Sequence, residues 1–493
     1  MISEKLKKAR DYEQANAKNI NSDERPAYHI STYVGWMNDP NGFSYYKNKY
    51  HLFYQYHPYG LNWGPMHWGH VTSEDLIHWE YLPCAIAPDA EYDDFGCFSG
   101  SAVEMPDGKH LLMYTGVIEK ELENGSKDVK QVQCIAFGDG TNYEKYENNP
   151  VLTAKDLPEG GSVIDFRDPK IWQEQDGSYA CIVGNRVDDG SGALLIYRSD
   201  DCINWHFDTV LDKCNNEYGR MWECPDYFEL DGKKVILTSP QDMQKDGYEF
   251  HNGNGTLCLI GSYDENLKKF KRENIQAIDY GLDFYAPQTV LSPDGRRIMI
   301  AWMQNWDACH PPMTNPKWFG QMTVARELNI KNGRLIQNPV REIESVRTNK
   351  VYYNNVISGQ TKLDGICGRV VDMILNITPC KDKLYDNFAI KVASGHKFFT
   401  EISYNPITSI LSIDRSNSGS CRDIVHERKC KVADKNGEIK LRVLLDRFSV
   451  EIFVNDGEQA LSTTIYTPQT DNNIVFDVIG TANVEVEKYD LNM

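Results

Sequence analysis

Short apolar segments of strand length, separated by polar turn residues, run through most of the 493-residue chain. In its first two thirds, a two-residue turn leads repeatedly into such a segment. The five turns are Asn48-Lys49, Asp107-Gly108, Asp176-Gly177, Asp231-Gly232 and Asp294-Gly295. Glycine and asparagine tolerate the positive φ that tight hairpin turns require. The pattern therefore predicts hairpins and an all-β fold.

The turns recur at a regular spacing. Positions 48, 108, 177, 232 and 295 are 60, 69, 55 and 63 residues apart. Units of four short strands repeated around an axis form a β-propeller. From about residue 351 onward the unit stops, and alternating strands with Asn and Gly turns follow. We therefore predict an N-terminal helical extension (1–25), a five-bladed β-propeller (26–345) and a C-terminal β-sandwich (351–493).

Acidic residues occupy a fixed place in this repeat. The residues nine positions before the turns are Asp39, Ser99, Asp168, Glu223 and Ala286. In a propeller the first strands of the blades run side by side around the central axis, so their starts converge at one end of the channel. Like charges held close in a partly desolvated funnel raise one another's pKa and cost stability, which indicates a functional site. The alternative is that single acids open turns, as Asp before Pro commonly does.

The charge balance narrows the range of partners. The chain has 71 acidic and 52 basic residues, a formal net charge of −19, which argues against a nucleic-acid-binding surface and favours neutral partners. No apolar run approaches the roughly 20 residues of a membrane-spanning helix. Residues 1–20 lack the apolar centre of a signal peptide. We therefore expect a cytoplasmic protein with no membrane partner.

The 13 cysteines show neither metal-ligand spacing nor a compact disulfide framework. Buried, reduced thiols are the expected state, and no metal or cofactor is predicted. Whether the chain is a monomer or a homodimer stays open.

Aromatic residues crowd the segments beside the acids and point to sugar chemistry, because their rings pack on the apolar faces of sugars. Cleavage of a glycosidic bond needs one protonated acid and one ionised carboxylate. Arg167 should favour the ionised form of Asp168, whereas Trp222 and Cys224 flank Glu223 with an apolar stretch. The neighbours therefore favour Glu223 as the proton donor. They do not separate the nucleophile from the third acid.

Three motifs carry a resemblance to a known family. They are Trp36-Met37-Asn38-Asp39-Pro40-Asn41-Gly42, Phe166-Arg167-Asp168-Pro169 and Trp222-Glu223-Cys224-Pro225. In this order they resemble the signature motifs of the β-fructofuranosidases of glycoside hydrolase family 32. The resemblance implies a five-bladed propeller followed by a sandwich, and a retaining double displacement. It also implies that Asp39 is the nucleophile, that Glu223 is the acid and then the base, and that Asp168 stabilises the transition state.

The resemblance also implies which residues line the fructose subsite. They are Asn38, Gln55, Trp63, Phe98, Ser99, Arg167, Tyr285 and Trp302. The implied substrates are sucrose and short fructooligosaccharides, with sucrose 6-phosphate as a phosphorylated variant. Arg186, His310 and Lys317 are candidate cations near the rim. Gly184-Asn185-Arg186 departs from the Gly-Ala-Gln expected of many sucrose-6-phosphate hydrolases.

Three alternatives remain open at this stage. A fructosyltransferase needs the same three acids and differs in its acceptor site. An inverting arabinan-type glycosidase on a similar propeller is disfavoured by the first motif and by the C-terminal sandwich. A non-catalytic sugar-binding propeller has no need for all three carboxylates. The sandwich is expected to support the propeller, with carbohydrate binding or dimerisation as its lesser alternative.

Overall fold

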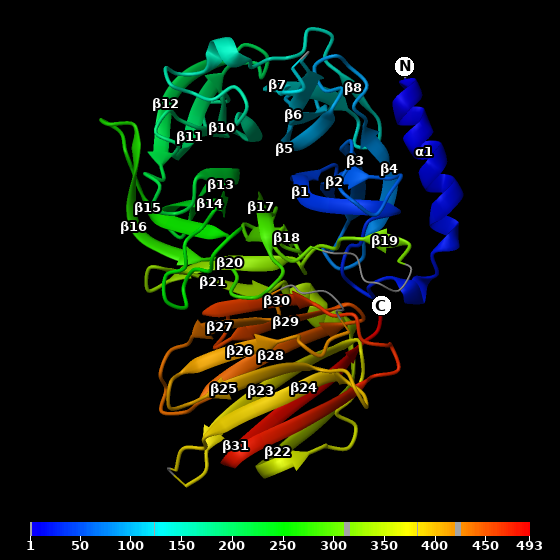
Figure 1. Cartoon of the computed structure of the whole chain (residues 1–493), viewed down its shortest axis with the longest axis vertical. Coiled ribbons are helices and arrows are strands. Elements are labelled where there is room, and N and C mark those ends of the chain that lie inside the picture. Colours follow the sequence, from blue (N-terminus) through cyan, green and yellow to red (C-terminus); the bar gives the residue numbers. More distant parts are fainter. Residues whose placement is uncertain (1, 123, 310–315, 382, 420–424) are drawn as a thin grey trace.

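The computed structural model describes residues 2–122, 124–309, 316–381, 383–419 and 425–493. Figure 1 shows a ring of small sheets above a second, separate β-structure, with one helix along the side of the ring. The prediction of an all-β, five-bladed propeller followed by a sandwich is confirmed. In the part of the chain that is described, no helix is long and apolar enough to cross a membrane.

Each blade is an antiparallel sheet of four strands in sequence order, numbered here from the axis outward. Blade I contains β1 (Gly35–Tyr46), β2 (Lys49–His57), β3 (His67–Ser73) and β4 (Glu80–Ile86). Blade II contains β5 (Gly96–Glu104), β6 (His110–Glu121), β7 (Lys127–Gly138) and β8 (Tyr143–Lys145). Blade III contains β9 (Arg167–Gln173), β10 (Tyr179–Arg186), β11 (Gly192–Ser199) and β12 (His206–Lys213).

The last two blades follow the same plan. Blade IV contains β13 (Met221–Leu230), β14 (Lys233–Gln241), β15 (Leu257–Asp264) and β16 (Lys269–Ala277). Blade V contains β17 (Tyr285–Leu291), β18 (Arg297–Trp302), β20 (Arg326–Lys331) and β21 (Arg334–Pro339). The short β19 (Trp318–Phe319) leaves blade V and pairs in parallel with β1 of blade I. This pairing, made through backbone hydrogen bonds, helps to close the ring between its last and first blades.

The predicted hairpins are confirmed, except that the first turn consists of Lys47 and Asn48 rather than Asn48-Lys49, because Lys49 already belongs to β2. Asn48, Gly108, Gly177, Gly232 and Gly295 have φ values of 62°, 79°, 90°, 75° and 86°, and each connects the first two strands of its blade. Residues other than glycine and asparagine rarely adopt this left-handed conformation. The turn residues therefore set the period of the propeller.

Helical segments are short and lie outside the blades. Helix α1 (Glu4–Asn16) begins at Ser3, whose hydroxyl caps the Leu6 amide. It packs on blade I, where Arg10 donates to the Cys84 carbonyl at 2.9 Å. The 3-10 helices are η1 (Ala17–Asn19), η2 (Ser22–Glu24), η3 (Ala154–Asp156) and η4 (Arg341–Val346).

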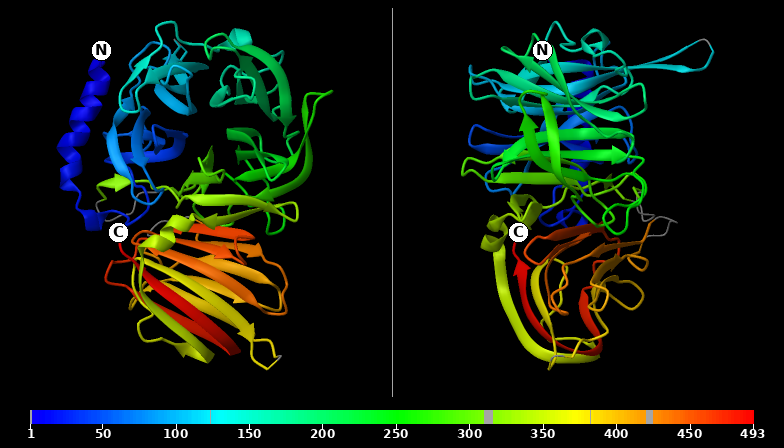
Figure 2. Two further views of the ribbon diagram at one scale, coloured as in Figure 1. Left: turned by 180° about the vertical axis from the view of Figure 1, so that it is seen from behind. Right: turned by 90° about the vertical axis from the view of Figure 1, so that its left-hand side faces the viewer.

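The sandwich forms from one continuous sheet that bends into two layers. Its strands are β22 (Arg347–Thr361), β23 (Val371–Pro379), β24 (Asn387–Ser394), β25 (Thr400–Asn405), β26 (Ile410–Asp414), β27 (Glu427–Lys431), β28 (Ile439–Asp446), β29 (Ser449–Val454), β30 (Gln459–Thr464) and β31 (Asn473–Leu491). The first part of β31 pairs with β24 and the second part with β23, on either side of Gly480. Figure 2 shows β22 and β31 curving from one layer into the other. The apolar side chains between the layers form the main core of this domain.

Candidate active site

One end of the propeller axis opens into a cavity of about 570 Å³. Its lining residues are Asn38, Asp39, Gln55, Trp63, Phe98, Ser99, Gln131, Ile164, Asp165, Arg167, Asp168, Glu223, Gln241, Asn254 and Trp306. The three acids of the nine-residue register all belong to this set. The starts of the inner strands therefore converge at one end of the channel, as the register predicts.

A β-bulge marks the register position in every blade. The pairing of the first strand with the second is interrupted beside Asp39, Ser99, Asp168, Glu223 and Ala286. A bulge sets two residues opposite one and changes the direction of a side chain. Asp168 and Ala286 have positive φ values of 66° and 51° there, conformations that cost free energy for residues other than glycine. The bulges thus help to aim the acids into the cavity.

Asp39 is held by two neutral donors. The Ser99 hydroxyl donates to Asp39 Oδ2 at 2.6 Å, and the Asn38 amide donates to Oδ1 at 3.2 Å. Asn38 is fixed in turn by the Trp36 indole, which donates to its Oδ1 at 2.9 Å. Burial raises the pKa of Asp39, the Ser99 hydrogen bond opposes this, and the Glu223 charge raises the pKa further. The carboxylate is therefore oriented, yet no cation among the described residues pairs with it directly.

Cys224 connects Asp39 with Asp168. Its Sγ lies 3.5 Å from Asp39 Oδ2 and 3.6 Å from Asp168 Oδ2, and its amide donates to Asp168 Oδ2 at 2.9 Å. Burial raises the pKa of Asp168 to about 7; Arg167 lowers it, and the charges of Glu223 and Asp39 raise it further. Arg167 does favour the ionised carboxylate, as its position in the sequence suggests, but burial outweighs it.

Glu223 lies beside a cation rather than in an apolar stretch. Arg167 Nε donates to Glu223 Oε1 at 3.0 Å, whereas the nearest contact of Arg167 with Asp168 measures 4.0 Å. The Tyr285 hydroxyl donates to the second oxygen, Oε2, at 2.6 Å. The apolar surroundings expected from Trp222 and Cys224 are thus wrong, because the Trp222 ring packs in the core and the Cys224 thiol lies between Asp39 and Asp168. A residue on another strand, Tyr285, provides the second contact.

Comparison with known proteins fits this geometry. The N-terminal domain of glycosyl hydrolases family 32 matches residues 29–339, and the C-terminal domain of that family matches residues 342–491. The chain belongs to glycosyl hydrolase family 32. It is therefore a glycosidase, as the three motifs predict.

Relatives of this family 32 enzyme cover nearly its whole length. It is 37% identical to the raffinose invertase of Escherichia coli over 91% of this chain and 90% of that protein. It is 31% identical to the sucrose-6-phosphate hydrolase of Bacillus subtilis, with 97% of each chain covered. The GH32 beta-fructofuranosidase of Bombyx mori superimposes with a TM-score of 0.84 at 36% identity, over 99% of this chain and 98% of that chain.

The structure places most of the subsite residues implied by the resemblance in the cavity of the family 32 enzyme. These are Asn38, Gln55, Trp63, Phe98, Ser99 and Arg167. Tyr285 is nearly completely buried and reaches the site through its hydroxyl, behind Glu223. Trp302 is not among the lining residues, since its side chain is fully buried. Trp306 covers it, with ring centroids 4.8 Å apart, and supplies the aromatic surface of the cavity instead.

Further lining residues were not identified from the sequence, because neither the nine-residue register nor the family resemblance pointed to them. They are Gln131, Ile164, Asp165, Gln241 and Asn254. Gln241 ends β14, and the side chain of Asn254 is held by Asp307, with Nδ2 donating at 2.8 Å. Amide side chains at the ends of second strands and in rim loops carry no distinctive spacing. Only the folded chain brings them together.

The three candidate rim cations lie apart from one another. Arg186 Nη1 lies 4.0 Å from Asp165 Oδ2, at the edge of the cavity. Lys317 pairs with Glu24 at 2.7 Å and lines a different pocket. His310 lies outside the described residues. Among the described residues, no cluster of three or more His, Cys, Asp or Glu side chains is arranged to hold a metal ion.

Proposed function

We propose that this family 32 enzyme hydrolyses terminal non-reducing β-D-fructofuranosides, with sucrose as its main substrate, through a covalent fructosyl-enzyme. The observation that carries the proposal is the convergence of Asp39, Asp168 and Glu223 in one cavity, linked by Cys224 and Arg167. The names of the relatives support it, and a mutant of the Bombyx mori enzyme has been solved in complex with sucrose.

The first step transfers the fructosyl group to Asp39. Glu223 donates a proton to the glycosidic oxygen, so the leaving sugar departs as a neutral alcohol. Asp39 Oδ attacks the anomeric carbon from the opposite face as the carbon–oxygen bond breaks, and an ester forms. Asp168 lies beside both groups and stabilises the positive charge that develops on the fructose ring.

The second step releases fructose. Glu223, now ionised, accepts a proton from water, whose oxygen attacks the anomeric carbon and breaks the ester to Asp39. Both carboxyl groups return to their starting states. Arg167 and Tyr285 hold the two oxygens of Glu223 in place through the cycle. Two inversions at the same carbon give net retention.

The stereochemistry of the first product tests the double displacement. Proton NMR recorded during the first turnovers of sucrose should show β-D-fructofuranose before mutarotation occurs. Initial release of the α-anomer would exclude the fructosyl-enzyme. Mass spectrometry of protein quenched during turnover should detect a hexosyl adduct on the peptide that contains Asp39.

The charge of the cavity favours neutral sucrose over sucrose 6-phosphate. Among the described lining residues, the four carboxylates of Asp39, Asp165, Asp168 and Glu223 face one guanidinium, that of Arg167. Arg167 already pairs with Glu223 and with Asp165, at 3.0 and 2.8 Å. A phosphate group therefore meets net negative charge. We expect a higher kcat/KM for sucrose than for sucrose 6-phosphate, and the reverse order would overturn this choice of substrate.

A further inference from the structure

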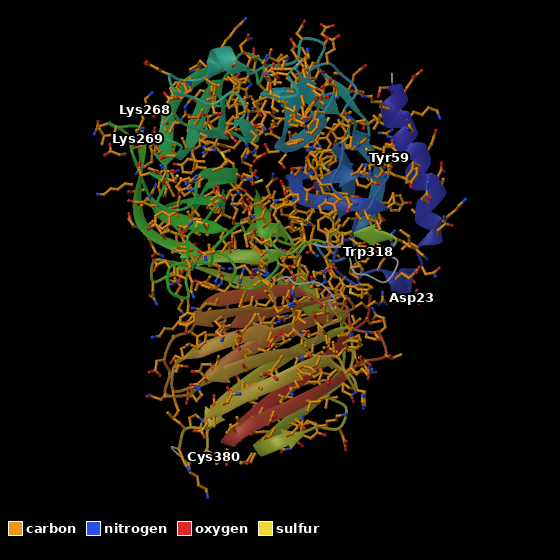
Figure 3. All side chains as sticks on the ribbon, in the orientation of Figure 1. Asp23, Tyr59, Lys268, Lys269, Trp318 and Cys380 are labelled. Carbon is orange, nitrogen blue, oxygen red and sulfur yellow. The ribbon has the colours of Figure 1, made fainter. Side chains whose placement is uncertain are left out.

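A second cavity, of about 420 Å³, lies where three parts of the chain meet. The N-terminal segment contributes Asp23 and Glu24, the connection between β18 and β20 of blade V contributes Gln304 and residues 316–321, and the sandwich contributes Phe448, Thr464 and residues 466–469. Figure 3 shows Asp23 and Trp318 at this junction. The volume falls in the lower part of the range that holds small-molecule ligands. This junction pocket shares no lining residue with the substrate cavity.

Aromatic rings form the walls of the junction pocket. Trp318 packs edge-on against Phe448, with centroids 5.4 Å apart and an interplanar angle of 86°. The Trp318 indole donates to the Glu24 carbonyl at 2.7 Å, which fixes the ring to the N-terminal segment. Phe319 and Tyr466 complete the apolar surface. Rings arranged in this way pack well against the C–H faces of a sugar.

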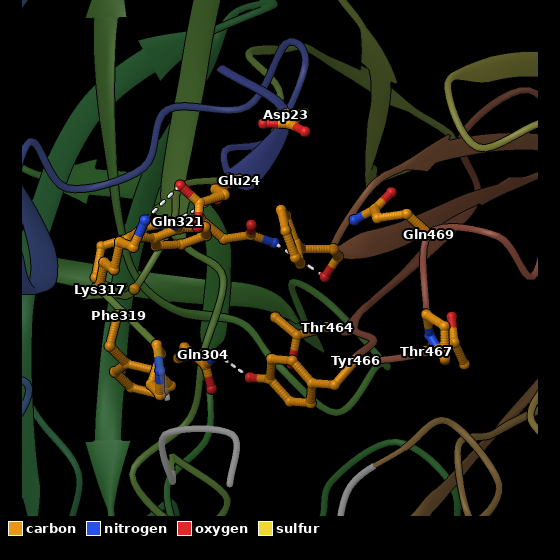
Figure 4. A pocket seen from close by; sticks show the side chains of 15 residues that line it. Asp23, Glu24, Gln304, Lys317, Phe319, Gln321, Thr464, Tyr466, Thr467 and Gln469 are labelled. Atoms are coloured by element: carbon orange, nitrogen blue, oxygen red, sulfur yellow. Dashed lines mark hydrogen bonds and ion pairs between the residues drawn. The ribbon is translucent and has the colours of Figure 1, made fainter. Parts of the chain in front are cut away.

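Amide side chains lie between these rings, as Figure 4 shows. Gln304 donates to the Tyr466 hydroxyl at 3.2 Å. Gln321 is only 2% exposed, and its Oε1 has no hydrogen-bond partner among the described residues. The amide of Gln469 and the hydroxyl groups of Thr464 and Thr467 also line the pocket, and such groups pair with the hydroxyl groups of a ligand. The polar groups of the pocket therefore favour a hydroxyl-bearing ligand over a purely apolar one.

The charges of the junction pocket disfavour an anion. Lys317 is paired with Glu24 at 2.7 Å, and Asp23 adds a second carboxylate. Like the substrate cavity, the pocket combines aromatic rings, amides and hydroxyl groups. It lacks the cluster of three acids. It has the groups that bind a sugar without those that cleave one.

We propose that the junction pocket is a second, non-catalytic binding site for a neutral saccharide of one or two hexose units. Phe319 forms part of its wall and packs on Trp36, with centroids 5.0 Å apart, so this aromatic pair separates the pocket from Asn38 in the substrate cavity. A sugar bound there contacts the N-terminal segment, the propeller and the sandwich together. The choice of sucrose as the test ligand rests on the proposed function.

Fluorine NMR of protein labelled with 5-fluorotryptophan tests the two sites separately. Trp318 reports on the junction pocket and Trp63 on the substrate cavity, and each signal is assigned by its Trp→Phe variant. The Asp39→Asn protein is titrated with sucrose, because it binds without turnover. We expect both signals to shift and to saturate with different apparent Kd values. A Trp318 signal that stays unchanged while the Trp63 signal saturates would overturn the proposal.

Matched variants and ligands complete the test. Gln469→Ala removes one amide of the junction pocket and should weaken the Trp318 response by about threefold or more, while Gln360→Ala, an exposed change in β22, should leave it unaltered. Glucose should shift the Trp318 signal and glucose 6-phosphate should not; equal responses would overturn the neutral-ligand assignment. A response of Trp318 without one of Trp63 would support the junction pocket and count against the proposed function.

Discussion

The substrate cavity, called the funnel below, and the contact region between the propeller and the sandwich, called the seam, both bury several carboxylates. They differ in the cations that lie beside those carboxylates. In the funnel, Asp39, Asp168 and Glu223 share one guanidinium, that of Arg167. In the seam, Asp446 and Glu451 face His29, at 2.8 and 2.9 Å. Acids in both regions are largely buried, so the number and placement of the cations decide what burial does to each acid.

The seam stabilises ionised acids. Burial opposes ionisation, but the hydrogen bonds and charge of His29 lower the pKa of Asp446. Burial likewise opposes ionisation of Glu451, and the charges of Arg326 and His29 lower its pKa. Arg326 also bonds to Asp279 at 3.0 Å, so the network joins the N-terminal segment, blade V and the sandwich. Its charges are paired, and removal of one partner leaves the others uncompensated.

In the funnel, the negative charges of the acids outnumber the positive charges beside them. Burial raises the pKa of Asp39 and raises that of Asp168 to about 7. Such groups cost stability in their ionised forms and are correspondingly reactive toward a developing positive charge. Substitution of a seam acid should therefore lower the stability of the fold, and substitution of a funnel acid should lower the rate of catalysis.

The largest expected effect is that of Asp39→Asn. We predict that kcat for sucrose falls by roughly 10⁴-fold, since the amide cannot form the fructosyl ester. The melting temperature should stay the same or rise, because one desolvated carboxylate is removed. Steady-state kinetics and calorimetry measure both quantities. The exposed change Asp456→Asn is the control, and a kcat for Asp39→Asn near that of the control would refute the assignment.

Glu223→Ala should lower kcat by about 10³-fold on sucrose and by much less on a fructoside with an activated leaving group such as p-nitrophenol. Only the poor leaving group needs the proton. The ratio of the two kcat values checks the role of Glu223. Equal losses on both substrates would assign the proton to another residue.

In the seam, Glu451→Gln should lower the free energy of unfolding by about 3 kcal/mol, because Arg326 and His29 lose a buried charge partner. The folded protein should keep its kcat. Urea denaturation measures the first quantity and initial rates the second. Glu427→Gln, on an exposed edge of the same sandwich, is the matched control; equal stability of the two variants would remove the distinction between the regions.

The smallest expected effect is on the alkaline side of the stability curve. Burial lowers the pKa of His29, but its hydrogen bonds to Asp446 and Glu451 outweigh this and raise the pKa from 6.5 to about 9. A raised pKa in the folded state contributes stability below pH 6.5 that is lost as the pH rises through 9. We predict a loss of about 2 kcal/mol between pH 7 and pH 9.5. His29→Gln should flatten this dependence, and an unchanged slope would show that another group titrates.

The conformational preferences of single residues determined much of the fold. The turn residues from Asn48 to Gly295 reveal the period of the blades, since their positive φ is a property of single residues. Counting back from those turns leads to Asp39, Asp168 and Glu223, because a hairpin of fixed length places them at equivalent bulges. These conclusions need only the covalent order of the chain and the geometry of a hairpin.

Contacts between distant segments decided the rest. Arg167 adjoins Asp168 in the chain, yet it donates to Glu223, 56 residues away, because β9 and β13, the inner strands of neighbouring blades, start side by side. His29 binds Asp446 across 417 positions, and Trp306 rather than Trp302 reaches the cavity. The sequence alone thus determined which residues stand at each strand start. Only the tertiary structure decided which charges meet in the dry interior, because burial and distance there set the pKa values and a linear order contains neither.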